Sequence, residues 1–255
     1  MTKSNLNRFF VLPENIYDNK LRISGTDVKH IKTVLRLKEG DEIIIFDGTG
    51  NEYIAVIDSL DDELNCTIKD KRDIENPKCA GITLLQGVPK GSKMDYVVQK
   101  CTETGVNDII PLITERTVVK LDDKRKIAKK NRWQKIAKSS AQQSKSSIVP
   151  IIHEPVSLDE ALDIVREHSL KLIAWESEYI TSLRDILKKH HASLISPDSS
   201  IAICIGPEGG FSYQEVDKAK SKGMIPVSLG SRILRSESAG FATCVMILYE
   251  LDAMG

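Results

Sequence analysis

Two glycine-bearing stretches near the end of the chain combine the residue types that could bind a ligand and transfer a proton. The first is Gly206-Pro207-Glu208-Gly209-Gly210, directly after the apolar run 201–205. The second runs from Leu229 to Glu237 and adds another glycine, two arginines and an acid. Glycine lets the backbone approach a ligand closely, while arginine and glutamate can stabilise charge and accept a proton. Together they form a candidate ligand site.

Neither stretch matches a common nucleotide-binding motif. No Gly-Lys-Ser/Thr follows the first glycine run, and its spacing differs from Gly-x-Gly-x-x-Gly. Taken alone, such a run is more often a tight turn than a site. The second stretch, about twenty residues later, favours a site, because open α/β sheets bind ligands where strand-end loops meet.

Helices are predicted to follow both stretches. Ser212 and Glu215 have the spacing of a capping box. Ser236 is predicted to cap the final helix, which runs from Ala239 to about Leu251. Glu237 would then lie in its first turn, where a negative charge is favoured; this is the alternative to a catalytic role.

Composition indicates an ordinary globular protein. The 255 residues are 41% hydrophobic and 28% charged with zero formal net charge, so any nucleic-acid surface must be local. The N-terminal residues lack the pattern of a signal peptide and no apolar run approaches a membrane span, so we expect a cytoplasmic protein. Five scattered cysteines without a Cys-x-x-Cys pair predict neither a disulfide framework nor a metal site.

The chain divides by pattern into two parts joined by a polar linker at 73–80. Residues 1–72 contain short strands at 8–12, 42–46, 52–58 and 64–69 with one helix at 27–36, which is typical of a small barrel. From 81 onward, strands alternate with helices. This α/β pattern predicts a mostly parallel sheet with helices on both faces, with strands at 82–86, 108–114, 149–152, 170–174 and 201–205.

One stretch, 114–145, is strongly basic. It holds eleven lysines and arginines against three acids. A solvated helix face would explain this pattern, with Ile127, Trp133, Ile136, Ala137 and Ala141 on the buried side. Contact with a phosphate backbone would also explain it. The window alone leaves both interpretations open.

Ordered motifs along the whole chain resemble the 16S ribosomal RNA (uracil-N3)-methyltransferase family of the SPOUT superfamily. The resemblance rests on Arg8-Phe-Phe, His30-x4-Leu35-Arg36, Lys90-Gly-x-Lys93-Met94-Asp95, Gln99-Lys100-x-Thr102-Glu103, Pro111-x3-Glu115-Arg116, Arg132-Trp133, Ile205-Gly-Pro-Glu-Gly-Gly-Phe-Ser212 and Leu229-Gly-x-Arg232-Ile-Leu-Arg235-x-Glu237. It implies a PUA-like β-barrel RNA-binding domain (1–72) and a SPOUT methyltransferase domain (81–255) with a deep C-terminal trefoil knot. It also implies a homodimer.

The resemblance implies S-adenosylmethionine as cofactor, converted to S-adenosylhomocysteine, and no metal. By carry-over, the residues expected to bind it are Leu172, Ala174, Trp175, Gly206, Glu208, Gly209, Gly210, Leu229, Gly230, Ile233, Leu234 and Arg235.

Methylation of uracil N3 in 16S ribosomal RNA of the small subunit is the implied reaction. Glu237 and Arg235 are the catalytic candidates, as proton acceptor and anion stabiliser. The N3 atom lies on the Watson–Crick edge, so the base must be unpaired or flipped out. The residues expected to bind RNA are Arg8, Arg36, Lys90, Lys93, Arg116 and Arg132.

Two alternatives stay open at this point. The same fold could methylate another RNA atom, such as a ribose 2′-hydroxyl. A non-catalytic assembly factor could instead bind RNA through the basic stretch alone, but such a protein has no need of the glycine loops.

Overall fold

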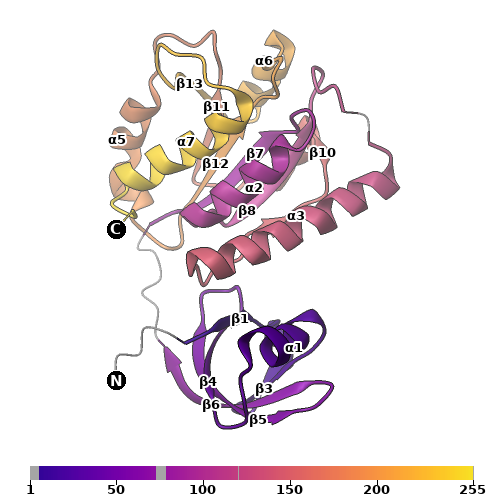
Figure 1. Cartoon of the computed structure of the whole chain (residues 1–255). Coiled ribbons are helices and arrows are strands. Elements are labelled where there is room, and N and C mark those ends of the chain that lie inside the picture. Colours follow the sequence, from indigo (N-terminus) through magenta and orange to yellow (C-terminus); the bar gives the residue numbers. More distant parts are fainter. Residues whose placement is uncertain (1–5, 73–78, 120, 255) are drawn as a thin grey trace. The chain divides into compact units, whose positions relative to one another are not determined.

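The computed structural model describes residues 6–72, 79–119 and 121–254. The chain forms two compact units, which we describe separately (Figure 1). Unit 1 contains the residues up to 76 together with 141–149, and unit 2 contains 77–140 and 150–255. Most of the predicted linker, 73–78, lies outside the described residues. None of the helices in the described part is long and apolar enough to cross a membrane.

Unit 1 is built on a curled six-stranded sheet with strand order β1-β4-β5-β6-β3-β2. The β1–β4 pair is parallel and the other pairs are antiparallel. Alternate residues of the strands, such as Ile43, Ile45, Ala55 and Ile57, fill its buried core. The strands are β1 (Arg8–Phe10), β2 (Ile16–Tyr17), β3 (Lys20–Ile23), β4 (Glu42–Phe46), β5 (Glu52–Leu60) and β6 (Leu64–Arg72).

The sheet is open rather than closed, so this unit is the half-barrel form of the predicted barrel. The four predicted strands are confirmed, whereas β2 and β3 were not predicted. The predicted helix 27–36 is divided into α1 (Thr26–Lys29) and a π-helical segment (His30–Leu35), with Arg36 ending it at a φ of 54°. A short 3-10 helix covers Pro13–Asn15.

The segment 141–149 packs with this sheet although it follows a long stretch of unit 2. Gln142 Nε2 donates to the carbonyl oxygen of Arg8 (2.6 Å), and the Val149 amide donates to Gly48 O (3.0 Å). We had expected 81–255 to be one continuous domain. The sequence pattern of 141–149 does not show which of the two units the segment packs with.

Unit 2 contains a sheet in which every described pairing is parallel, as predicted. The strand order is β10-β8-β7-β12-β11-β13, and β9 also pairs with β8. The strands are β7 (Gly81–Gly87), β8 (Asp108–Ile113), β9 (Ile151–Ile152), β10 (Val156–Ser157), β11 (Leu170–Ala174), β12 (Ser200–Ile205) and β13 (Ile225–Val227).

Helices cover both faces of this sheet (Figure 1). On one face α2 and α7 pack against each other, and α7 also contacts β7 and β12. On the other face α4 and α6 share a buried core with alternate residues of the strands. The helices are α2 (Lys93–Thr104), α3 (Asp123–Ser144), α4 (Leu158–Ile164), α5 (Leu183–Leu194), α6 (Tyr213–Ser221) and α7 (Ser236–Glu250).

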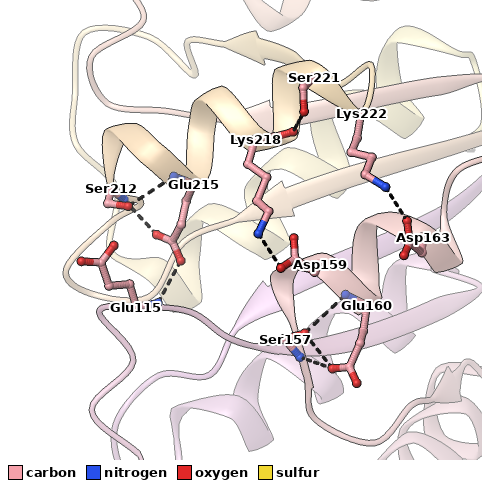
Figure 2. Close-up of polar contacts among 10 residues, drawn as sticks. All are labelled: Glu115, Ser157, Asp159, Glu160, Asp163, Ser212, Glu215, Lys218, Ser221 and Lys222. Atoms are coloured by element: carbon pink, nitrogen blue, oxygen red, sulfur yellow. Dashed lines mark hydrogen bonds and ion pairs between the residues drawn. The ribbon is translucent and has the colours of Figure 1, made fainter.

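Polar contacts fix α6 directly after the first glycine stretch (Figure 2). The predicted capping box is confirmed, since Ser212 Oγ accepts from the Glu215 amide (3.3 Å) and Glu215 Oε2 accepts from the Ser212 amide (2.9 Å). Glu215 Oε1 also accepts from the Glu115 amide (2.8 Å). One carboxylate therefore joins the cap of α6 to the loop after β8.

Candidate active site

A cavity of about 1050 Å³ opens at the carboxyl edge of the unit 2 sheet. Three chain segments line most of it, and each follows one of the adjacent strands β11, β12 and β13. Because parallel strands end at the same edge, the three segments meet there. We call 206–211 the first cavity loop and 228–235 the second cavity loop.

The first cavity loop is packed so closely that side chains at its glycines would clash. Gly210 has a φ of 66°, and a Cβ on it would lie 2.5 Å from Glu176 Oε1. A Cβ on Gly206 would lie 3.2 Å from the backbone of Gly210. The loop turns through a hydrogen bond from the Gly210 amide to Pro207 O (3.0 Å). The positive φ therefore favours glycine at 210, and the space at 206 is tight for any larger residue.

The second cavity loop presents apolar and cationic side chains. Gly230 has a φ of 117°, which favours glycine, and a Cβ there would meet no atom within 4 Å. Ile233 is 89% exposed and Leu234 is also exposed. Arg232 and Arg235 are exposed too, and neither has an ion-pair partner among the described residues. The wall of the cavity is thus partly apolar, with free guanidinium groups close by.

A buried hydrogen-bond chain connects the start of α7 to the first cavity loop. Ser236 Oγ donates to Gly206 O (2.6 Å) and accepts from Gln86 Nε2 (2.9 Å). Both side chains belong to buried residues. The prediction that Ser236 caps α7 is wrong, since Arg235 is the N-cap residue and makes no side-chain cap bond. The Ser236 hydroxyl instead donates to Gly206 O and accepts from Gln86 Nε2, so it does not cap the first amides of α7.

Lys93, at the start of α2, lies between two carboxylates. Its Nζ is 3.0 Å from Glu208 Oε1 and 3.4 Å from Glu237 Oε2. The Glu208 side chain raises the pKa of Lys93, chiefly through this hydrogen bond. Burial raises the pKa of Glu208, but hydrogen bonds from Lys93 and from backbone amides outweigh it, so that pKa is lowered. Glu237 is in the first turn of α7, as predicted.

The loop after β11 is held in place beside the second cavity loop. Glu178 Oε1 accepts from the amides of Ile180 (2.8 Å) and Thr181 (2.9 Å). Hydrogen bonding, first from Thr181 and then from Ile180, lowers the pKa of Glu178. The Ser228 amide donates to Thr181 O (2.8 Å). The fixed loop presents Tyr179, which is 85% exposed at the cavity.

Of the twelve residues predicted to bind the cofactor, all except Leu172 line the cavity. Leu172 is fully buried in β11 between β12 and β13. Sequence reasoning missed several lining residues of the loop after β11, of the two cavity loops and of the start of α7, because their positions carry no distinctive pattern. These include Glu176, Glu178, Tyr179, Ser182, Phe211, Ser228, Ser231 and Ser236.

Four of the six residues predicted to bind RNA lie in unit 2. Arg116 Nη1 donates to Gly209 O (2.8 Å), so it contacts the first cavity loop. Arg132 forms an ion pair with Asp95, which also accepts from Trp133 Nε1 (3.1 Å). Lys90 is exposed, and its amide donates to Glu208 (3.1 Å). Lys93 is the residue paired with Glu208 and Glu237.

The other two predicted RNA-binding residues lie in unit 1. Arg36 is exposed. The side chain of Arg8 is only 8% exposed, pairs with Glu52 (2.8 Å) and stacks on Phe46 with Cζ 3.9 Å from the ring centre. Its placement supports a packing role better than a contact with RNA.

The basic helix α3 carries its charge on an exposed side. Trp133, Ala137 and Ala141 are buried, as expected for the other side of the helix, and Ile136 is half-buried. The expectation is wrong for Ile127, which is exposed near the start of the helix. Lys124 and Lys135 are exposed. Among the described residues, no cluster of histidine, cysteine, aspartate and glutamate is suited to a metal ion.

Two family models match the chain. A family model described as RNA methyltransferase domain matches residues 75–248, which include both cavity loops and the start of α7. A second, described as RNA methyltransferase PUA domain, matches residues 23–70. The chain belongs to the RNA methyltransferase family. In this RNA methyltransferase the cavity, Lys93 and Glu237 therefore all lie within the domain that defines the family.

Relatives of this RNA methyltransferase match over most of its length. The ribosomal RNA small subunit methyltransferase E of Bacillus subtilis (strain 168) is 32% identical over 235 residues, 91% of each chain. The Synechocystis protein of the same name is 30% identical and covers 91% of this chain and 74% of its own.

Solved structures agree with the fold of both units. The ribosomal RNA small subunit methyltransferase E from Neisseria gonorrhoeae, bound to S-adenosyl methionine, has a TM-score of 0.82 at 32% identity and covers 96% of this chain and 98% of its own. A putative methyltransferase from Legionella pneumophila with bound cofactor SAM has a TM-score of 0.80 at 30% identity, with the same coverage.

Proposed function

We propose that this enzyme uses S-adenosylmethionine to methylate N3 of one uridine in the 16S ribosomal RNA of the small subunit. The observation that carries the proposal is the cavity at the carboxyl edge of the sheet, lined by eleven of the twelve predicted cofactor residues. The relatives named above, two of them with bound S-adenosyl methionine, support the same cofactor and substrate.

The residues of the cavity fit this cofactor. Ile233, Leu234 and Trp175 offer apolar surface for an adenine ring. Glu176 and Glu208 offer carboxylates for its cationic groups. The glycines of both loops leave their backbone amides and carbonyls open to a ligand.

Bound S-adenosylmethionine supplies an electrophilic methyl group, and the protein must prepare the nucleophile. Glu237 accepts the proton of N3–H, and the N3 electron pair then forms the bond to the methyl carbon as the carbon–sulfur bond breaks toward sulfur. Arg235 lines the cavity and stabilises the negative charge that develops on the uracil oxygens. The loops orient both reactants.

RNA binding is assigned to the cationic residues near the cavity and on α3. The exposed lysines of α3 and Arg116 contact phosphates, which carry no sequence information by themselves. Arg36, Lys90 and Arg132 are further candidates. The target base enters the cavity unpaired, because its N3 edge is otherwise occupied by base pairing.

A homodimer is supported by one side of α7. Along this helix the side that faces away from the sheet carries Phe241, Val245, Met246 and Tyr249, of which Tyr249 is 75% exposed. An apolar stripe of this kind suits packing against a second copy. Tyr249→Glu should then give a monomer by light scattering, whereas an unchanged mass would place the interface elsewhere.

The trefoil knot is likewise a proposal. It is supported by the return of the chain from β13 to α7, which contacts β7 and β12, and by the close approach of Gly87 to Pro207. A Cβ on Gly87 would lie 2.4 Å from Pro207 N. A cytoplasmic location follows from the proposed ribosomal substrate.

The test is mass mapping of modified nucleotides in 16S ribosomal RNA from cells that lack this protein. We expect the loss of one N3-methyluridine, and its return when the wild-type chain is restored. A different missing modification would assign another target, and an unchanged map would reject the proposal.

A further inference from the structure

Lys93 is the cation that joins the two halves of the active site. Its ammonium contacts Glu208, in the first cavity loop, and Glu237, in the helix that follows the second cavity loop. Lys93 itself lines the cavity. The sequence motif had suggested only a contact with RNA.

Pairing with two carboxylates leaves Lys93 little positive charge to attract an RNA phosphate. One ammonium within 3.0 and 3.4 Å of two carboxylates gives a cluster with a net negative charge. Such a cluster repels phosphate, so phosphate binding is not what this arrangement favours. The Glu208 carboxylate is also held by the Lys90 amide (3.1 Å), which fixes the position of the pair.

Glu237 depends on Lys93 more than Glu208 does. The Glu237 side chain is 15% exposed, and its Oε2 is buried without a hydrogen-bond donor among the described residues. The ionic contact with Lys93 is thus the interaction that compensates this oxygen. A buried carboxylate that loses its ionic partner is free to turn toward water. Such a turn would displace the proposed proton acceptor.

We propose that Lys93 is a positioning residue for methyl transfer, which holds the Glu237 carboxylate at the start of α7 by joining it to Glu208 of the first cavity loop. The proposal rests on the proposed function and deepens it. The charged groups around this contact are Lys93 on α2, Glu208 in the first cavity loop and Arg235, two residues before Glu237 at the N-cap of α7. Of these, Lys93 is the cation in ionic contact with the carboxylate.

The experiment compares Lys93→Met, Lys93→Arg and Lys100→Met in the full-length enzyme. Lys100 is the matched control, because it lies on the same helix and forms an ion pair with Glu103 (2.7 Å). Methyl transfer to small-subunit RNA is measured as kcat between pH 5.5 and 9, with calorimetric Kd values for S-adenosylmethionine and RNA. Thermal unfolding confirms that each variant is folded.

For Lys93→Met we expect kcat at pH 7 to fall by roughly ten- to a hundredfold. This is only part of the loss expected when a proton acceptor itself is removed, because Glu237 is still present. Both Kd values should stay within about threefold of wild type. Lys93→Arg should restore most of the rate, and Lys100→Met should keep the wild-type kcat.

Unchanged kcat in Lys93→Met would overturn the proposal, and together with a weaker Kd for RNA it would make Lys93 an RNA ligand. If Lys93→Met does not fold, Lys93→Gln takes its place, with the same expected loss of kcat. Absence of methyl transfer by the wild-type enzyme would reject the proposed function instead, so the two failures are distinguishable.

Discussion

The guanidinium of Arg116 donates a hydrogen bond to the carbonyl oxygen of Gly209 at 2.8 Å. The aliphatic part of the same side chain lies against this glycine, because a Cβ on Gly209 would be 3.1 Å from Arg116 Cβ. An arginine expected to bind RNA is therefore part of the support for the first cavity loop. The loop after β8 is joined to this region a second time through Glu115 and Glu215.

Arg116→Ala should weaken cofactor binding as well as RNA binding. A hydrogen bond from a charged group to a carbonyl contributes about 1.5–3 kcal/mol, and exposure of Arg116 reduces this, so we expect a roughly three- to tenfold higher Kd for S-adenosylmethionine. Calorimetry without RNA measures it. Arg125→Ala removes an exposed arginine of α3 and serves as the control. Equal cofactor affinity in the two variants would contradict the role of Arg116.

Ser236→Ala should destabilise unit 2, because it leaves the Gly206 carbonyl without this donor and the Gln86 amide with only its contact to Gly87 O (3.2 Å). The expected loss in the free energy of unfolding is about 1–3 kcal/mol, the cost of unsatisfied buried polar groups. Urea unfolding measures it. Ser238→Ala, two residues later on α7, should change the free energy of unfolding by less. A stable Ser236→Ala variant would show that the chain Gln86–Ser236–Gly206 is not needed.

Arg235→Ala should lower turnover far more than cofactor affinity. In the proposed mechanism the guanidinium acts on charge that develops only during transfer, and loss of such a donor costs roughly a hundred- to a thousandfold in kcat. Single-turnover rates and calorimetry separate the two quantities. Arg184→Ala, an exposed arginine that does not line the cavity, is the comparison. Unchanged turnover in Arg235→Ala would remove this residue from the mechanism.

His168 should make the protein less stable in mild acid. Burial lowers its pKa below the ordinary value of 6.5, and Asp108 opposes this only in part. The folded state therefore resists protonation, whereas the unfolded state takes up a proton below about pH 6.5. Stability is complete above that pH and falls as the pH drops toward the folded pKa.

His168→Gln should keep a side chain able to bond Thr83, which is 2.9 Å from Nε2 in the wild type. We expect a smaller difference in Tm between pH 7.5 and 5.5 than in the wild type. His190→Gln, on α5, should behave like the wild type. Equal acid sensitivity of His168→Gln and the wild type would mean that other groups cause it.

Much of the fold was predictable because its signals are local. The Ser212–Glu215 capping box, the helix ended by Gly105 and the alternation of strands and helices depend on neighbours within a few residues. The glycine loops were predictable as a site for the same reason. Their conformations demand glycine, as at Gly210, and the demand shows in the sequence.

What could not be predicted depends on contacts between distant residues. Ser236 has the sequence of a cap, but Gly206 and Gln86, 30 and 150 residues away, take its hydroxyl. Lys93 and Arg8 have the sequence of surface cations, but carboxylates at Glu208, Glu237 and Glu52 pair with them. The sequence shows which residues are charged, but their ion-pair partners depend on tertiary packing.

The measurement that tests the central claim most directly is methyl transfer by the purified enzyme to small ribosomal subunits that lack the modification. Labelled S-adenosylmethionine provides the methyl group, and mass spectrometry of nuclease digests identifies the product. We predict one labelled N3-methyluridine in 16S ribosomal RNA, and at least a hundredfold less with Arg235→Ala. Label on a ribose oxygen or another base, or no label at all, would contradict the account.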